Sequence, residues 1–201
     1  MKKDTSRLAG FTLVELLLVI VIMALMIGLA VPAMNSLGRA NAVSSGSSQL
    51  ANDLSLARAK AIASRSRVRV IFAENDNTNA NVQAKTSYAM LLWTNRTADI
   101  PANWIYLDRW RHLPLGAYFI TNSSFAPIPA ASIPFPTNGG SASSAMPCIE
   151  FKSTGAPTSS GNIDFAIQEG TVVDGVVRSV KAANTLTNRV HAITGKVKVM
   201  K

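Results

Sequence analysis

The chain has 201 residues and a formal net charge of +9, with 20 lysine and arginine residues against 11 aspartate and glutamate residues. This length accommodates one domain with an extension and excludes two large hydrophobic cores. The single cysteine, Cys148, excludes an intrachain disulfide, and we expect it to be a small packed side chain. The positive charge favours anionic partners, such as nucleic acid or lipid headgroups, without selecting among them.

The N-terminal segment has the pattern of an export signal. Lys2, Lys3 and Arg7 precede a long apolar stretch, so the positive-inside rule places this end in the cytoplasm and the rest of the chain across the membrane. Residues 16–34 contain no charged side chain, and this run is about as long as a helix must be to cross a hydrocarbon core of roughly 30 Å. We therefore expect a transmembrane helix over 11–34.

One carboxylate, Glu15, interrupts the apolar stretch, where insertion of a central acidic group is unfavourable by roughly 2.5–3.5 kcal/mol and by less near the interface. Cleavage between Gly10 and Phe11 would create an α-amine at Phe11. That cation could pair with Glu15 on the same or a neighbouring helix, and the carboxylate would then be an assembly contact. Pro32 removes one helical hydrogen bond, so we expect a kink or local loosening there.

The order Gly10-Phe11-Thr12-Leu13-Val14-Glu15, followed by an apolar helix containing Pro32, resembles the signal of type IV pilins and type II secretion pseudopilins. The resemblance implies that residues 1–10 are a leader, that a prepilin peptidase cleaves after Gly10, and that Phe11 is N-methylated. It also implies insertion in the bacterial inner membrane with a periplasmic globular domain, and later entry into a pseudopilus or surface pilus. The alternative is an ordinary secretory signal and a soluble exported protein beginning near Val31.

The sequence changes period after the apolar stretch. Apolar residues recur at helical spacing from Leu50 to Ala61, which predicts an amphipathic continuation of the helix over 35–64. Arginines at 65, 67 and 69 then alternate with Ser66, Val68 and Val70, as in a strand with one apolar face. We place the start of a β-rich globular domain, 65–201, at this change.

Further strand candidates are rich in β-branched or aromatic residues and are bounded by turn residues. They are 87–93, 104–107, 116–121, 148–152, 163–167, 176–181 and 190–199. Two segments, 74–82 and 122–146, have loop composition, and the second is a long insertion. The predicted fold class is α+β: a long N-terminal transmembrane and amphipathic helix followed by a small antiparallel, sandwich-like β-domain.

Four segments of the globular part resemble the GspH/FimT group of minor pilins and pseudopilins. They are residues 54–62, 113–116, 149–155 and 194–198. The resemblance implies a filament subunit at or near the tip, with other pilins or pseudopilins as partners. Some members of the group bind DNA through a C-terminal Gly-Arg-x-Arg segment; here the positions read Gly195-Lys196-Val197-Lys198, so point charges replace the guanidinium forks.

The candidate DNA contacts are Arg189, Lys196 and Lys198, with the arginines of 65–69 and the aromatic and basic run 104–112 as further candidates. Alternating arginines are more typical of the solvated face of an edge strand. The polar run 74–79 lacks the glycine and distal glutamate of an EF-hand loop. His112 and His191 have no accompanying nucleophile or metal-ligand pattern, so we expect no catalytic site, no metal and no cofactor.

Overall fold

The computed structural model describes residues 12–74, 82–94, 99–100, 103–121, 125–128, 146–173 and 176–200, with backbone alone at 29–37, 39–40, 126–128 and 179–182. The chain forms two compact units, Met1–Gly38 and Arg39–Lys201. The expected leader, 1–10, and Phe11 lie outside the described residues. Each unit is described by itself below.

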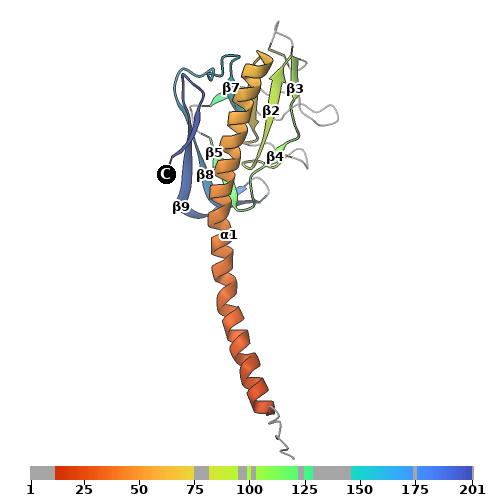
Figure 1. Ribbon diagram of the computed structural model, residues 1–201, viewed down its shortest axis with the longest axis vertical. Coiled ribbons are helices and arrows are strands. Elements are labelled where there is room, and N and C mark those ends of the chain that lie inside the picture. The colour runs from red at the N-terminus through yellow and green to blue at the C-terminus, as the bar shows by residue number, and fades with distance from the viewer. Residues whose placement is uncertain are drawn as a thin grey trace, which may run out of the picture. The chain divides into compact units, whose positions relative to one another are not determined.

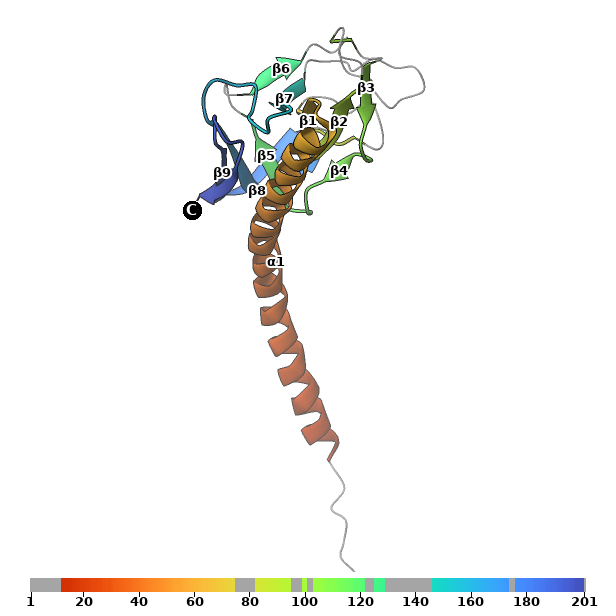
Figure 2. The ribbon, with the colours of Figure 1, turned by 45° about the horizontal axis from the view of Figure 1, so that its top comes forward.

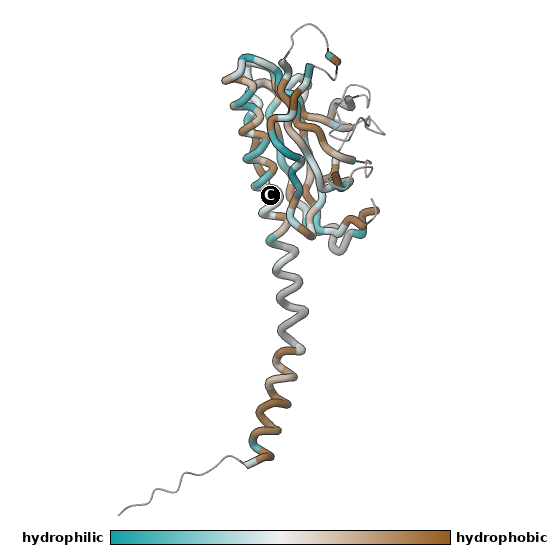
Figure 3. The backbone as a smooth tube through the Cα atoms, turned by 90° about the vertical axis from the view of Figure 1, so that its right-hand side faces the viewer, coloured by the Kyte–Doolittle hydropathy of each residue, from teal (hydrophilic) through white to brown (hydrophobic). Residues whose placement is uncertain are grey.

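The helix α1 (Leu13–Ser64) is continuous, so the expected loosening at Pro32 does not interrupt it. The side chain of Pro32 lies outside the described residues. Figure 3 shows apolar colouring along the N-terminal part of α1, where the large side chains from Leu13 to Ile27 are 42–80% exposed. Among the described residues, no helix combines the length and the apolarity needed to cross a membrane.

The described part of Arg39–Lys201 contains ten strands after α1. They are β1 (Val68–Phe72), β2 (Ser87–Trp93), β3 (Trp104–Tyr106), β4 (Arg111–His112), β5 (Ala117–Ile120), β6 (Ala126–Ile128), β7 (Met146–Phe151), β8 (Ile163–Val173), β9 (Val176–Val190) and β10 (Val197–Met200). A six-stranded sheet has the order β3-β2-β1-β7-β6, with β4 also paired to β2, and a four-stranded sheet has the order β10-β9-β8-β5.

Every strand pairing in the described chain is antiparallel, which confirms the predicted α+β class. The two sheets and the C-terminal part of α1 enclose one core. Figures 1 and 2 show this part of α1 lying between β8 and β9 on one side and β2 and β4 on the other. The aromatic rings of Phe72 and Phe119 join the sheets edge to face, with centroids 5.2 Å apart.

The apolar stripe predicted on the second half of the helix is confirmed. Leu50, Leu54, Ala57 and Ala61 are fully buried, because their spacing places them on the one face of α1 that meets the sheets. Burial at this face holds the helix to the domain. Ser47 and Asn188 are also buried there. Their side chains form two hydrogen bonds with each other: Ser47 Oγ donates to Asn188 Oδ1, and Asn188 Nδ2 donates to Ser47 Oγ.

The prediction of a loop over the whole of 122–146 is wrong. Strand β6 lies within it and pairs with β7, and Phe125 is 6% exposed with its ring 5.3 Å from that of Phe72. The short run Phe125 to Ile128 is surrounded by serine, proline and alanine, so composition hid it. Pro127 is tolerated because β6 is at the edge of its sheet. Residues 122–124 and 129–145 lie outside the described chain.

The C-terminal strands were also predicted with the wrong bounds. The expected strand 176–181 is part of the much longer β9, and the expected strand 190–199 is divided between the end of β9, a turn and β10. The second half of β9 contains Asn184 and Asn188, a residue type that strands disfavour, and Asn188 is buried. Pairing with β8 holds this half in the strand conformation.

The helix α1 ends in a Schellman motif. The backbone N–H groups of Ser66 and Arg65 donate to the carbonyls of Ala61 and Ile62, each at 3.2 Å. Arg65 is the left-handed residue of this motif, with φ of 47°. A non-glycine residue in that conformation is unfavourable by about 1–2 kcal/mol, so an arginine here is an unusual choice.

Candidate functional sites

The first turn of α1 is held by a reciprocal capping box between Thr12 and Glu15. The backbone N–H and hydroxyl of Thr12 donate to Glu15 Oε2 at 2.9 and 3.0 Å, and the backbone N–H of Glu15 donates to Thr12 Oγ1 at 3.2 Å. These bonds satisfy backbone donors that a helix start leaves open. The expected partner of Glu15, the Phe11 amine, lies outside the described residues. The Thr-x-x-Glu pattern of the sequence would have predicted Thr12 as a capping partner of Glu15.

Three of the four segments that carry the resemblance meet at one point in the globular unit. Gly155 follows β7 with φ of +82°, and Gly195 precedes β10 with φ of +64°. A Cβ atom on Gly195 would lie 2.0 Å from the Gly155 carbonyl oxygen. Arg58 of α1 reaches the same place, where its Nε donates to the Thr194 carbonyl at 2.7 Å. Glycine is required here because the two backbones touch.

The three C-terminal cations have different surroundings. Arg189 is held by Asp164, with Nε and Nη2 each donating to a separate carboxylate oxygen at 2.7 Å. Lys198 lies opposite Arg189 in the register of β10 and β9, and both Lys198 and Lys196 are exposed. The structure thus brings Arg189 and Lys198 together, although the guanidinium fork already binds a carboxylate.

The interpretation of the alternating arginines as the solvated face of an edge strand is wrong for Arg67 and Arg69. β1 lies between β2 and β7. Arg67 and Arg69 both donate to Glu150 of β7, at 3.0 and 2.6 Å, and Arg69 also pairs with Asp99. Their alternation with apolar residues is correct for a strand, but Glu150 lies far along the chain and could not be assigned as their partner from the pattern.

The indole rings nearby complete this cluster on the outer face of the six-stranded sheet. The Arg67 guanidinium carbon lies 3.5 Å from the centroid of the Trp93 ring, and that of Arg69 lies 3.9 Å from the Trp104 ring. These are cation–π distances. Trp104 also donates from Nε1 to Asp99 at 2.8 Å. The residues are therefore engaged with one another.

The remaining part of the aromatic and basic run braces the sheet to α1. Arg111 pairs with Asp53 of the helix and with Asp108, and Tyr88 donates to Asp53 at 2.6 Å. Burial, together with Asp53, raises the pKa of Tyr88, so its hydroxyl stays protonated as the donor. His112 Nδ1 lies 2.9 Å from Ser87 Oγ, which is fully buried and is not presented to a substrate.

Two other predicted features have simple surroundings. Glu74, at the start of the polar run considered for calcium, accepts from Lys85 Nζ at 3.0 Å, and residues 75–79 lie outside the described chain. Cys148 is buried, and burial raises the pKa of its thiol to about 12. The expectation of a small packed cysteine is therefore confirmed.

Comparison with known proteins identifies the N-terminal segment. Residues 6–31 match the family of the prokaryotic N-terminal methylation motif, a match that includes Gly10, Phe11 and Glu15. The N-terminal segment of the chain thus carries this methylation motif. A search among curated proteins finds no match.

Two groups of solved structures are similar to this chain. The minor pilin FimU of Pseudomonas aeruginosa is 11% identical, with 80% of this chain and 90% of that chain covered and a TM-score of 0.49. The minor pseudopilin EpsH from the type 2 secretion system of Vibrio cholerae is 10% identical, with 79% and 95% covered and a TM-score of 0.47.

Proposed function

We propose that the chain is a minor pilin or pseudopilin, cleaved after Gly10, N-methylated at Phe11, and incorporated in a type IV pilus or a type II secretion pseudopilus. The observation that carries the proposal is the methylation motif over residues 6–31, because it covers the cleavage site, the methylated residue and Glu15 together. In this function the chain has no substrate to transform. Its activity is assembly.

The exposed apolar surface of α1 supports this function. A contiguous run of large apolar side chains that remains in water marks an interface with a membrane or with another protein. The inner membrane would cover it first, and the helices of other subunits would cover it in the filament. Each apolar Å² removed from water contributes roughly 25 cal/mol, so packed helices can replace lipid as the surroundings of this segment.

The capping box gives Glu15 two roles that can be separated. Cleavage leaves Thr12 and Glu15 in the mature chain, so the carboxylate still accepts from the helix start. We propose that it also accepts an ion pair from the Phe11 amine of a neighbouring subunit, which would fix the axial register of the two helices. The charge serves assembly, whereas the hydrogen bonds to Thr12 serve the helix.

Mass spectrometry of the mature N-terminus, on protein isolated from its own membranes, tests the processing. The expected chain begins at an N-methylated Phe11, and a chain beginning near Val31 would contradict the proposal.

Three variants then test Glu15. Glu15→Gln keeps an oxygen for Thr12 but removes the charge, so it should be processed and fail to enter filaments; Thr12→Ala, the matched control, weakens the cap and should still assemble. Equal incorporation of Glu15→Gln, Glu15→Ala and the parent chain would exclude the ion pair.

DNA binding by the C-terminal hairpin has weaker support as a second function. Lys196 and Lys198 are exposed and Lys198 lies beside Arg189, so the hairpin carries local positive charge. Replacing both lysines with alanine should weaken DNA binding and reduce its salt dependence if they contact phosphates. Unchanged affinity and salt dependence would remove the hairpin from consideration.

A further inference from the structure

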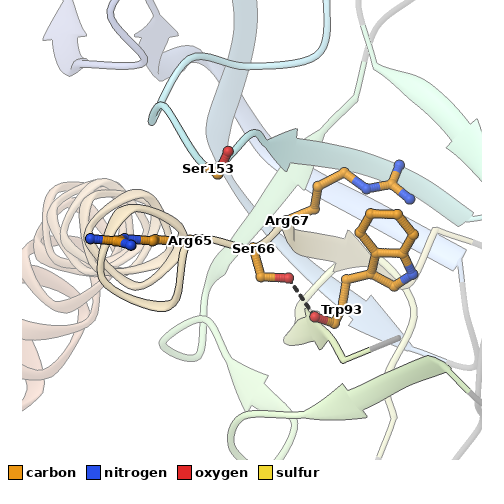
Figure 4. A pocket seen from close by; sticks show the side chains of 5 residues that line it. All are labelled: Arg65, Ser66, Arg67, Trp93 and Ser153. Carbon is orange, nitrogen blue, oxygen red and sulfur yellow. Dashed lines mark hydrogen bonds between the residues drawn. The ribbon is translucent and has the colours of Figure 1, made fainter. Parts of the chain in front are cut away.

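The two ends of the globular unit differ in what their side chains contact. Where α1 gives way to β1, a pocket of about 180 Å³ is lined by Arg65, Ser66, Arg67, Trp93 and Ser153 (Figure 4). The Arg67 guanidinium pairs with Glu150 and lies against the Trp93 ring, and the Ser66 hydroxyl donates to the Trp93 carbonyl. These groups are engaged within the chain, whereas the end of the unit beside Gly46 presents apolar side chains to solvent.

The turn after Leu113 presents a leucine to solvent on a fixed backbone. The Ala117 N–H donates to the Pro114 carbonyl at 3.1 Å, and Gly116 has φ of +95°, the conformation that a type II turn requires at its third residue. Leu115 takes the second position and is 95% exposed, whereas Leu113 is buried. The turn therefore buries one leucine and holds the other in water.

The end of the β8–β9 hairpin adds two more exposed apolar side chains beside this turn. Val173 and Val176 are cross-strand neighbours and are 45% and 61% exposed. Leu115 of the turn and Val172 of β8 line one small cavity of about 40 Å³, so the turn and the hairpin lie side by side. The side chains of Leu115, Val173 and Val176 are called the apolar end below. No part of the proposed function uses them.

The apolar end lies where the chain enters the globular unit. That unit begins at Arg39, and a Cβ atom on Gly46 would lie 3.3 Å from Cδ of Pro114, so α1 packs directly on the turn. The expected membrane segment ends at residue 34, and from there to Gly46 a helix spans about 18 Å. A short tether of this kind strengthens a weak apolar contact, because it raises the local concentration of lipid at the patch.

The chemistry of the apolar end favours lipid over an anionic partner. Arg178 is exposed and lies opposite Thr171 in the register of β8 and β9, and its charge is offset in the sequence by Asp174, which lies outside the described residues. Exposed leucine and valine without net charge suit the boundary between lipid headgroups and acyl chains, where apolar side chains leave water. A nucleic acid or an acidic protein would need an excess of cations.

We propose that the apolar end docks on the lipid bilayer that anchors the N-terminal segment, with Leu115, Val173 and Val176 inserted among the headgroups. The inference rests on the proposed membrane insertion of residues 11–34. Docking holds the globular unit at the membrane before the chain enters a filament, and extraction from the bilayer releases the same side chains. A neighbouring subunit is the competing occupant, and the test includes it as an outcome.

The test places a fluorescent label at position 115 of the full-length chain, inserted in vesicles of equal parts phosphatidylcholine and phosphatidylglycerol. Leu115→Cys is labelled with nitrobenzoxadiazole under native conditions, since Cys148 is buried and should not react. Lipids that carry a nitroxide at the headgroup should quench this label at least about threefold more than the same label at Ile193→Cys. Ile193 is the matched control, because it is 78% exposed but lies beside Thr194, which Arg58 of α1 contacts farther along the helix than Gly46.

Two further variants test the apolar nature of the contact. With the label at position 115, Val176→Ser should lower the quenching about twofold because it removes apolar surface from the contact. Leu56→Ser, on the exposed side of α1, should leave the quenching unchanged. A higher salt concentration should also leave it unchanged, because salt screens ionic contacts and not apolar ones.

Flotation of the chain with the vesicles separates a failure of docking from a failure of membrane insertion. A chain that does not float with the vesicles contradicts insertion, and the proposed function and the docking then fail together. A chain that floats while the label is quenched equally at positions 115 and 193 contradicts docking alone. Quenching that salt abolishes would assign the contact to charge, and a label that responds to the number of chains per vesicle but not to the nitroxide would assign it to a second subunit; each overturns the inference.

Discussion

The two sheets place the same kind of ion pair in opposite surroundings. On the outer face of the six-stranded sheet, Glu150 of β7 pairs with Arg69 of β1 and with Arg67, which precedes β1, and the side chains of Glu150 and Arg69 are each 8% exposed. On the outer face of the four-stranded sheet, Asp164 of β8 pairs with Arg189 of β9, and these side chains are 35% and 40% exposed.

The difference follows from what lies over each sheet. The outer face of the six-stranded sheet carries a second apolar cluster around Ile71, Leu91 and Cys148, with Trp93 and Trp104 beside the arginines. Arg69 there is largely removed from water, so its charge depends on its carboxylate partners and on the Trp104 ring. The outer face of β8 and β9 has alternating polar residues in contact with solvent. Charge pairs there have water as an alternative partner.

The largest expected effect is at Glu150. Replacement by alanine would leave the buried Arg69 with Asp99 as its carboxylate partner within the described residues and would remove the carboxylate that pairs with Arg67. We expect the free energy of unfolding to fall by about 3–5 kcal/mol, as for other buried pairs that lose one partner. Urea unfolding of the full-length chain measures it. Glu150→Gln, which keeps one acceptor oxygen, should lose less. A loss below that of Asp164→Ala would show that the outer face is hydrated.

The next largest loss of stability is expected where the turn after β7 touches the turn before β10. Gly195→Ala would place Cβ 2.0 Å from the Gly155 carbonyl oxygen in a left-handed conformation, so the backbone must move. We expect a loss of about 3 kcal/mol, measured by the same unfolding experiment. Gly155→Ala meets the end of the Ile62 side chain at 2.7 Å and should lose less because that side chain can move.

Gly161→Ala is the matched control for the two turn glycines. Nothing lies within 4 Å of a Cβ atom at that position, and its φ is not in the left-handed region. The variant should change stability by less than about 0.5 kcal/mol. If all three glycine variants behaved alike, the close approach of the two backbones would be excluded as the reason for Gly195.

The sequence predicts the architecture better than the environment of its charges. Helical spacing from Leu50 to Ala61 located the buried face of α1, and alternation located β1, because both patterns are local. Alternation could not say whether the side of β1 that carries Arg69 faces water. That depends on Trp104 and Glu150, which are distant in sequence. The capping partner Thr12 was predictable, since its signal spans only four residues.

A small effect is expected from the exposed pair of the four-stranded sheet. Asp164→Ala or Arg189→Ala should lower the free energy of unfolding by about 0.2–1 kcal/mol, the range of exposed ion pairs, because water replaces the lost partner. Raising the salt concentration should reduce this loss further. A loss of several kcal/mol would mean that this face is covered in solution, and the contrast between the sheets would disappear.

The smallest expected effect is the pH dependence of the same pair. Hydrogen bonds from Arg189 hold the pKa of Asp164 below its ordinary value. A carboxylate with a depressed pKa in the folded state contributes stability that is complete above the unfolded pKa, about 3.9, and is lost as the pH falls through the folded value. The stability difference between the parent chain and Asp164→Asn should therefore be constant from about pH 7 to pH 5 and should shrink below about pH 4.

Urea unfolding at a series of pH values measures this difference, with Lys198→Ala as a control that removes a neighbouring charge without touching the carboxylate. A difference that grows on acidification would contradict the direction of the Asp164 pKa shift. A constant difference down to about pH 2 would show that the pair adds no carboxylate-dependent stability. Either result would leave Arg189 available to another anion and would strengthen the case for DNA at the C-terminal hairpin, where Lys198 is its cross-strand neighbour.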